Sequence, residues 1–248
     1  MKTVLITGCS SGFGLETART FLDRDWNVVA TMRNPRAVNL PSTDRLRIVA
    51  LDVTDAESIR RAVEAAGDID VLVNNAGLGL FNALEGTPMD EVRSIFEINT
   101  FGPMAMMQAV LPQFRARKSG VIVNVSSSVT LKPLHLLSVY TASKTALNGF
   151  SASVALELEP FGVRVRTVLP GRAPETRFAE NAAARNPIAG IPEAYAGIAQ
   201  SVFAAWQQQP ANEVTHAADV AEAIWRAATD PSCPMRLPAG ADAVALAA

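Results

Sequence analysis

The sequence is poor in the residues that build disulfide frameworks and metal sites. Its 248 residues include two cysteines, Cys9 and Cys233, and two histidines, His135 and His216. Two cysteines near opposite ends of a chain are not the pattern of a disulfide-stapled secreted protein, and no cysteine or second histidine stands at ligand spacing from either histidine. These absences argue against a disulfide framework, a zinc site and a histidine-based catalytic triad. They indicate a reducing compartment, and we expect the cytoplasm.

Long apolar runs and blocks of one charge are also missing. The first apolar run, Val4 to Ile6, has three residues, whereas a membrane span needs ~20 and a signal peptide needs a longer apolar core. The formal net charge is -2, and basic and acidic residues are scattered along the chain. Such a chain has no basic footprint for nucleic acid or an anionic membrane. We therefore predict a small molecule, and neither nucleic acid nor a membrane, as the binding partner.

Short β-branched runs alternate with longer segments of helical period. Strands are predicted at residues 3–7, 27–32, 47–51, 70–74, 120–126 and 163–169, with a short edge strand near 235–238, and helices at residues 14–24, 55–66, 89–117 and 138–160. The strands are nearly all apolar, which is typical of a parallel sheet covered on both faces. The alternation predicts an α/β fold, a Rossmann-like doubly wound parallel sheet with helices on both faces, in one domain over residues 1–248.

The composition changes after Pro170. Residues 172–210 are rich in alanine and glutamine, are interrupted by prolines such as Pro174 and Pro192, and contain no strong strand pattern. Segments at the carboxyl ends of parallel strands commonly carry function. We predict loop and short helices here, and we expect this segment to cover a substrate site.

A glycine-rich turn lies between the first predicted strand and the first predicted helix. It reads T-G-C-S-S-G-F-G from Thr7 to Gly14, and it matches neither G-x-G-x-x-G nor G-x-x-x-x-G-K-[ST]. Glycines let a backbone approach a pyrophosphate, and the helix N-terminus behind them presents free N–H groups. On this loop alone, an ordinary tight turn between strand and helix is the alternative.

Tyr140 and Lys144 form a second pattern, four residues apart in a predicted helix. Side chains at this spacing project from one face of a helix, about 6 Å apart along its axis. An ammonium group near a phenol stabilises the phenolate and lowers the pKa of a tyrosine from its usual value near 10. By itself, the spacing also arises often by chance on helix surfaces.

Hydroxyl and amide side chains follow two of the predicted strands. Ser126, Ser127 and Ser128 stand where a hydroxyl can bond a developing oxyanion, or where serines simply form a turn. The run Asn74 to Gly77 also fits either a ligand contact or a turn that uses left-handed backbone. Asn99 lies inside a predicted helix, where asparagine is a poor helix former, so a local feature must tolerate or use it.

Together these motifs resemble the short-chain dehydrogenase/reductase family in its single-domain branch. The family pattern also accounts for Asp52 after the third predicted strand and Pro170-Gly171 after the sixth, so that the resemblance covers residues 3 to 171 in order and spacing. It implies an NAD(P)-dependent oxidoreductase that reduces a ketone or aldehyde, or oxidises a secondary alcohol.

The resemblance also implies a role for each matching residue. Tyr140 would exchange a proton with the substrate oxygen, and Lys144 would lower the pKa of Tyr140 and bond the nicotinamide ribose. Ser127 would hold the substrate oxygen, and Asn99 would help position a water that leads protons to Lys144. The implied cofactor contacts are Gly8, Ser10, Ser11, Gly12, Phe13 and Gly14 at the phosphates, Asp52 and Val53 at the adenine, Asn75, Ala76 and Gly77 at the adenosine ribose, and Pro170 and Gly171 at the nicotinamide.

The choice of cofactor depends on the residues after the second predicted strand. An acidic residue there would bond both hydroxyls of an adenine ribose and repel a 2′-phosphate, and the sequence has none before Asp44. Arg33 is placed to pair with a phosphate, unless it is a solvated loop arginine. Because Ser11 stands where NADP-dependent relatives carry a basic residue, the prediction of NADP(H) over NAD(H) depends on Arg33.

Two departures from the family pattern concern positions near the site. Many members carry a threonine four residues after the glycine of the P-G pair, whereas this chain has Glu175 there and Thr176 next, as though one residue had been inserted. Thr130 and Lys132 stand where small glycines are frequent in the family. Lys132 would either attract an anionic substrate or be a solvated charge.

Apolar residues outside the motifs predict a small hydrophobic carbonyl compound or alcohol as substrate. We expect an apolar pocket shaped by the covering segment together with Phe81, Leu134, His135, Leu136 and Leu137. A silent nucleotide-sensing or scaffolding protein with the same fold is the alternative, and epimerisation or dehalogenation fits less well. By resemblance, we expect a homodimer or homotetramer formed through residues 89–117 and 138–160.

Overall fold

The predicted strands form one parallel sheet. The structure, a computed structural model, describes residues 1–35, 39–185 and 190–248. Within these residues, strands pair in the order β3-β2-β1-β4-β5-β6-β7, and every neighbouring pair is parallel. They are β1 (Thr3–Thr7), β2 (Asn27–Met32), β3 (Leu46–Ala50), β4 (Val71–Asn74), β5 (Gly120–Val125), β6 (Val163–Pro170) and β7 (Arg236–Ala239). The prediction of a doubly wound sheet is confirmed, with its change of direction between β1 and β4.

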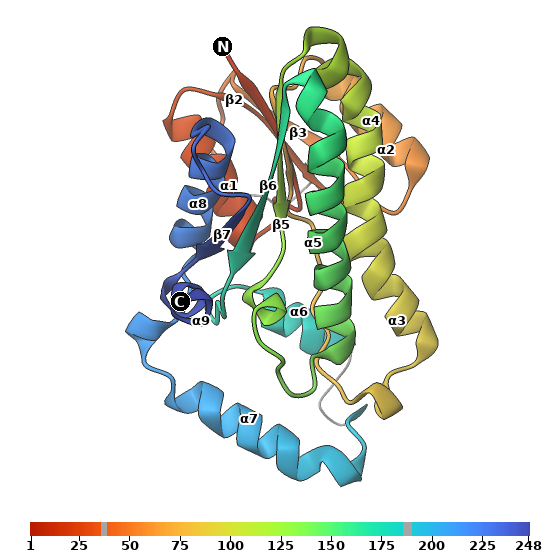
Figure 1. Ribbon diagram of the computed structural model, residues 1–248, viewed down its shortest axis with the longest axis vertical. Coiled ribbons are helices and arrows are strands. Elements are labelled where there is room, and N and C mark those ends of the chain that lie inside the picture. Colours follow the sequence, from red (N-terminus) through yellow and green to blue (C-terminus); the bar gives the residue numbers. More distant parts are fainter. Residues whose placement is uncertain (36–38, 186–189) are drawn as a thin grey trace.

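Helices cover both faces of this sheet (Figure 1). On one face lie α1 (Gly12–Asp23) and α8 (Ala217–Thr229), and on the other lie α2 (Ala56–Ala66), α4 (Gly102–Arg117) and α5 (Ser138–Leu158). Parallel strands are joined by such crossover helices, which bury both faces of the sheet. The three predicted layers are therefore present.

Each face of the sheet has its own buried core. Val4 and Ile6 of β1 pack with Phe21 of α1 in one core, and the intervening Leu5 packs with Met106 of α4 in the other. Successive side chains of a strand point to opposite faces. The continuous apolar runs of the central strands are explained by this alternation between two apolar cores.

The long helix predicted at residues 89–117 is confirmed in its extent, and it contains a local π-helical distortion. α3 (Met89–Phe96) passes into a π-helical turn (Glu97–Phe101), which is followed by α4. Single π turns inside helices are frequent at functional sites. This one contains Asn99, the residue that fits poorly into a regular helix.

The segments that follow β6 lie at the carboxyl edge of the sheet. They include α6 (Phe178–Arg185) and α7 (Ala196–Gln208), and α9 (Ala241–Ala247) comes after β7. Figure 1 shows α7 set off from the sheet beyond the ends of the strands, with α6 between α7 and the sheet. No helix among the described residues has the length and apolarity that a membrane span requires.

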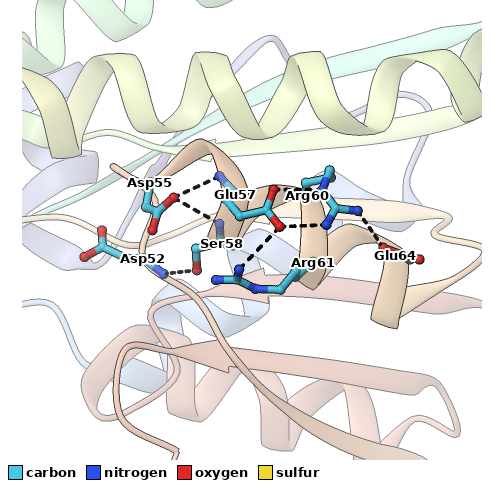
Figure 2. A network of polar contacts seen from close by, with 7 residues as sticks. All are labelled: Asp52, Asp55, Glu57, Ser58, Arg60, Arg61 and Glu64. Carbon is cyan, nitrogen blue, oxygen red and sulfur yellow. Dashed lines mark hydrogen bonds and ion pairs between the residues drawn. The ribbon is translucent and has the colours of Figure 1, made fainter.

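A polar network fixes the turn between β3 and α2 (Figure 2). Asp55 caps α2, because its Oδ1 accepts hydrogen bonds from the backbone N–H groups of Glu57 (2.9 Å) and Ser58 (3.2 Å). Ser58 Oγ in turn accepts a hydrogen bond from the backbone N–H of Asp52 (3.0 Å). The cap therefore also holds the backbone of Asp52, whose carboxylate points away from the network.

Candidate active site

The carboxyl ends of β1, β4, β5 and β6 open into one cavity of about 1460 Å³. This cavity is lined by most of the residues that were predicted to form the site: Gly8, Ser10, Ser11, Gly12, Phe13, Arg33, Asp52, Val53, Asn75, Ala76, Gly77, Ser127, Tyr140, Lys144, Pro170 and Gly171. Gly14 and Asn99 are buried behind its wall. The fold thus brings together motifs that are spread over more than half of the chain.

The glycine-rich loop and the turn after β4 pack backbone against backbone. Gly8 has a φ of +77°, and a Cβ there would lie 2.8 Å from the Cα of Ala76. A Cβ at Gly14 would collide with the carbonyl oxygen of Gly8 and lie 2.5 Å from Asn75 Nδ2. Only glycine satisfies these two positions, and such close backbone approach is typical of a pyrophosphate cradle.

α1 begins at Gly12, at the rim of the cavity. Its N-cap residue, Ser11, makes no side-chain capping bond, and its first turn carries no acidic residue. The first N–H groups of a helix have no partner within the helix, and together with the helix dipole they attract anions. The residues of this loop therefore fit the phosphates of a dinucleotide.

Thr7 ties the two halves of this cradle together. Its Oγ1 accepts hydrogen bonds from the backbone N–H groups of Asn75 (3.0 Å) and Ala76 (2.9 Å). Asn75 returns a bond from Nδ2 to the Thr7 carbonyl oxygen (2.9 Å) and contacts the Gly8 carbonyl oxygen (3.2 Å). This role of Thr7 was not predicted, although its place as the first residue of the glycine motif was a signal.

Asn99 joins the loop after β4 to α5. Its Oδ1 accepts a hydrogen bond from the Leu78 N–H (2.8 Å), and its Nδ2 donates to the Leu78 carbonyl (2.9 Å) and to Ser143 Oγ (3.1 Å). Ser143 Oγ donates to the Tyr140 carbonyl (2.8 Å). The asparagine in the π turn thus clamps the backbone of Leu78, and its implied role toward a water stays a prediction.

Tyr140, Lys144 and Ser127 lie together in the cavity wall. Lys144 Nζ donates to the Val125 carbonyl at the end of β5 (2.9 Å), and Tyr140 and Lys144 are both buried. Burial raises the pKa of Tyr140 to about 12, against the opposing effect of a hydrogen bond with Ser127. Burial also lowers the pKa of Lys144 to about 8.

The pKa of Tyr140 therefore shifts in the direction opposite to the one expected from its spacing to Lys144. Helical spacing takes account of the neighbouring charge, whereas burial penalises the charged form of the phenol, and burial dominates here. The pKa of Tyr140 is thus raised overall, and the implied effect of Lys144 on it stays a prediction.

Arg33 and Asp52 lie on the side of the cavity predicted for the adenosine. The Asp52 carboxylate accepts hydrogen bonds from the Thr54 N–H (2.9 Å) and hydroxyl (2.7 Å), which lower its pKa, and the charge of Arg33 acts in the same direction. The Arg33 side chain is exposed. A cation is thus placed beside the predicted adenine contact.

The apparent insertion after Pro170-Gly171 is accommodated by Glu175. Its carboxylate turns to the start of α8, where it accepts a hydrogen bond from the Ala217 N–H (2.8 Å) and pairs with His216 Nδ1 (3.1 Å). Thr176 lines the cavity instead and packs on the glycine loop, with its Cβ 3.4 Å from where a Cβ of Gly12 would lie. Thr176, rather than Glu175, stands at the site.

The apolar part of the cavity differs from the prediction at two residues. Phe81, Leu134 and Leu137 line it, whereas His135 and Leu136 do not. Leu136 has a φ of +60°, and its carbonyl accepts a hydrogen bond from the Asn82 N–H (2.9 Å). Because this residue has left-handed backbone, the four residues from Leu134 to Leu137 do not all face the cavity.

The covering segment contributes an aromatic wall to the cavity that was not predicted from the sequence. Phe203 and Trp206 of α7 pack with Phe81 at ring distances of 5.1 and 5.2 Å, and with each other at 5.6 Å. Phe178 of α6 lies 5.8 Å from the ring of Tyr140. Their spacing on helices was visible in the sequence, but which cavity they face was not.

Comparisons with known proteins agree with this arrangement. A family model described as short chain dehydrogenase matches residues 2–186. An uncharacterized oxidoreductase, YusZ of Bacillus subtilis (strain 168), is 42% identical over 181 residues, which are 68% of this chain and 64% of that protein. Retinol dehydrogenase 8 of Homo sapiens is 39% identical over 181 residues, 68% of this chain and 58% of that protein. The match spans less than two thirds of the length of either relative.

Solved structures resemble nearly the whole chain. A short chain dehydrogenase from Burkholderia cenocepacia J2315, in complex with NADP, has 26% identity and a TM-score of 0.78 over 100% of this chain and 93% of its own. A 3-ketoacyl-(acyl-carrier-protein) reductase from Brucella melitensis, complexed with NADH, has 26% identity and a TM-score of 0.79 over 96% of both chains. Together with the family match and the site geometry, these likenesses show that the chain belongs to the short-chain dehydrogenase family.

Proposed function

We propose that this protein is an oxidoreductase that reduces a ketone or aldehyde, or oxidises a secondary alcohol, with Tyr140 as the acid or base. The observation that carries the proposal is the position of Tyr140, Ser127 and Lys144 in one wall of a cavity that also contains a glycine cradle and an open helix N-terminus. When bound, a nicotinamide dinucleotide supplies the hydride. The protein's own residues supply orientation and the proton.

Each of the three polar residues has a distinct task in this proposal. Tyr140, whose pKa of about 12 keeps it neutral, presents an O–H to the substrate oxygen and donates its proton as negative charge develops there. Ser127 holds the same oxygen by a hydrogen bond. Lys144, with a pKa of about 8, is mostly a cation at pH 7, and it would bond the ribose and stabilise the phenolate left by Tyr140.

The size and lining of the cavity support two ligands. Its volume of about 1460 Å³ exceeds the ~300–1,000 Å³ of ordinary ligand pockets, which leaves room for a substrate beside a dinucleotide. The substrate part is lined by Phe81, Phe203 and Trp206, so we propose a hydrophobic carbonyl compound or alcohol. A relative named for retinol accords with this class.

We propose NADP(H) as the preferred cofactor, with NAD(H) as the less favoured one. Arg33 lines the cavity near Asp52, and its guanidinium would pair with a 2′-phosphate. Structural relatives include one with NADP and one with NADH, so the argument depends on Arg33 rather than on them.

The proposal extends to the organisation of the protein. Residues 1–248 act as one dinucleotide-binding domain in which residues 172–210 cover the substrate, although residues 186–189 lie outside the described part. α4 and α5 would form the contact of a homodimer or homotetramer, for which the 72% exposed Leu156 on α5 is a suitable apolar group. We expect the protein in the cytoplasm.

The activity is tested by following NADPH oxidation with a panel of ketones and aldehydes. In Tyr140→Phe, kcat should fall by about 10²–10⁴-fold, because the general acid is removed while the ring still packs. NADPH binding, measured by fluorescence titration, should stay within twofold of wild type. Full activity in Tyr140→Phe would remove the tyrosine from the mechanism, and binding without turnover in wild type would favour a nucleotide sensor.

The cofactor preference is tested by the ratio of kcat/KM for NADPH and NADH. Arg33→Ala should lower this ratio about tenfold or more, since a charge-assisted bond to phosphate contributes about 1.5–3 kcal/mol. The fluorescence Kd for NADPH should weaken by a similar factor and that for NADH should not. An unchanged ratio would exclude Arg33 as the selective residue.

A further inference from the structure

Among the residues of α6 that line the cavity, Phe178 lies against the ring of Tyr140. Its ring lies 5.8 Å from the ring of Tyr140, with the two planes tilted by 57°, and it lines the cavity. Aromatic pairs at this separation stabilise the fold by more than the burial of their apolar area alone contributes. Phe178 is itself 39% exposed, whereas Tyr140 is 7% exposed. The phenylalanine therefore covers part of the tyrosine from the side of the covering segment.

The ring of Phe178 occupies a notch left by Gly79. A Cβ at residue 79 would lie 2.7 Å from Phe178 Cε1 and 3.3 Å from the Cβ of Ala182, and both of these residues belong to α6. Gly79 is not among the glycines of positive φ, so its backbone does not require glycine. Glycine is needed here instead because a side chain would keep α6 from packing against this loop.

The floor of this notch is fixed. Gly79 follows Leu78, whose N–H and carbonyl are both bonded to the side chain of Asn99 (2.8 and 2.9 Å). Asn99 is fully buried and is itself tied to α5 through Ser143. A side chain added at residue 79 cannot be absorbed by moving this backbone, so it must displace Phe178 and α6.

We propose that Phe178 determines substrate specificity: α6 seats its ring in the notch at Gly79, where it forms an apolar wall beside the hydroxyl-bearing ring of Tyr140 and favours bulky apolar carbonyl substrates over small ones. This inference rests on the proposed function and deepens it. Phe178 is a positioning and packing group here, because the proton remains with Tyr140.

Substrate size separates this role from general damage to the fold. For Phe178→Ala, KM for an aryl alkyl ketone should rise about tenfold, whereas KM for a short aliphatic ketone and kcat for both should stay within about twofold. Phe178→Leu should restore most of the loss, because it keeps an apolar side chain. The matched control is Phe161→Ala, a phenylalanine that is 37% exposed beyond the far end of α5, and it should match wild type. Equal effects on both ketones would overturn the proposal.

If the ring of Phe178 sits in the notch, the effect of Gly79→Ala on KM should depend on whether Phe178 is present. Gly79→Ala alone should raise KM for the aryl ketone about tenfold, since it pushes the ring away from Tyr140. In a Phe178→Ala background the same substitution should change KM by less than twofold, because the colliding ring is gone. Gly149→Ala, where an added Cβ meets nothing within 4 Å, should have no effect. Additive effects of Gly79→Ala and Phe178→Ala would contradict the docking.

Proteolysis tests the docking without turnover. Trypsin cleaves after arginine, and Arg177 directly precedes Phe178, so cleavage there reports how often the start of α6 opens. Gly79→Ala and Phe178→Ala should each accelerate cleavage after Arg177 at least fivefold, and unchanged cleavage in both would overturn the docking. If these rates change as expected but wild type reduces no carbonyl compound, the proposed function fails while the docking of Phe178 stands.

Discussion

The dinucleotide cradle and the covering segment line the same cavity, but they are held in different ways. The cradle is held by close backbone contacts and by hydrogen bonds to backbone groups, such as those of Thr7 with Asn75 and Ala76. The covering segment is held by side chains, including Arg172, which bonds Gln209 Oε1 (2.7 Å) and the Trp206 carbonyl (3.2 Å), and Tyr195, which bonds Glu85 (2.9 Å).

This difference determines how freely residues can be substituted in the two regions. A backbone contact at a glycine allows no side chain, so the cradle admits one residue type at its critical positions. A single side-chain hydrogen bond contributes only about 0.5–1.5 kcal/mol, so the covering segment can be altered one residue at a time. The cradle therefore suits a ligand that stays the same, the dinucleotide. The covering segment suits a substrate that differs between relatives.

The largest effect is expected in the cradle. Gly14→Ala places a methyl group against the Gly8 carbonyl and Asn75 Nδ2, and overpacking of this kind costs about 1–3 kcal/mol. The free energy of unfolding in urea should fall by about that amount, and NADPH binding should be lost in fluorescence titration. Gly149→Ala is the matched control. If Gly14→Ala bound NADPH with wild-type affinity, the cradle would tolerate a side chain at residue 14, which contradicts this prediction.

A smaller effect is expected where the covering segment is tied. Arg172→Ala removes the bonds to Gln209 and Trp206, so that the aromatic wall on α7 loses one anchor. KM for an aryl alkyl ketone should rise about fivefold to tenfold, as expected for one or two hydrogen bonds. The Kd for NADPH and the urea midpoint should change little. Arg172→Lys is the matched variant, because it keeps the charge but not both bonds. A large loss of NADPH affinity in Arg172→Ala would contradict this prediction and would assign the arginine to the cofactor site.

The smallest effect is a pH dependence at the start of α8. A hydrogen bond to Glu175 raises the pKa of His216, and the Ala217 N–H followed by His216 lowers the pKa of Glu175. The histidine contribution to stability is fully present below its unfolded pKa of about 6.5 and is lost as pH rises through the folded value. The glutamate contribution is present above about pH 4.3 and is lost as pH falls through its folded value.

Both contributions are therefore present between about pH 4.3 and 6.5. The difference in Tm between wild type and His216→Asn should be largest near pH 5.5 and should decline toward pH 8.5. Asparagine is chosen because it also caps helices, so the start of α8 is preserved. A Tm difference that is constant over this range would mean that the pair does not act through charge.

The sheet and most of the cavity lining were predictable because their signals are local. Each central strand is an apolar run of a few residues, and motifs at the carboxyl ends of parallel strands must meet at one edge. Gly8 and Ser127 were placed at the cavity in this way, and Tyr140 by its helical spacing to Lys144 and the family resemblance. β3 and β7 differed from the predicted ranges by one residue at either end.

Features that depend on contacts between distant segments were not predictable. The π turn contains Asn99, whose side chain bonds Leu78 and Ser143 in two other segments of the chain. The direction of the Tyr140 pKa shift depends on burial, which helical spacing does not describe. The aromatic wall of Phe203 and Trp206 depends on where α7 lies, and its composition carries no motif.

The strand order β3-β2-β1-β4-β5-β6-β7 also has a consequence for how the protein is made. After β1, β2 and β3 have paired, β4 joins the free side of β1, and each later strand joins the newest edge. During synthesis from the N-terminus, no strand has to be inserted between two that are already paired. The cradle contacts from Thr7 to Gly77 can form while the ribosome is still translating the chain, and the covering segment, which follows β6, is added to a cradle that already exists.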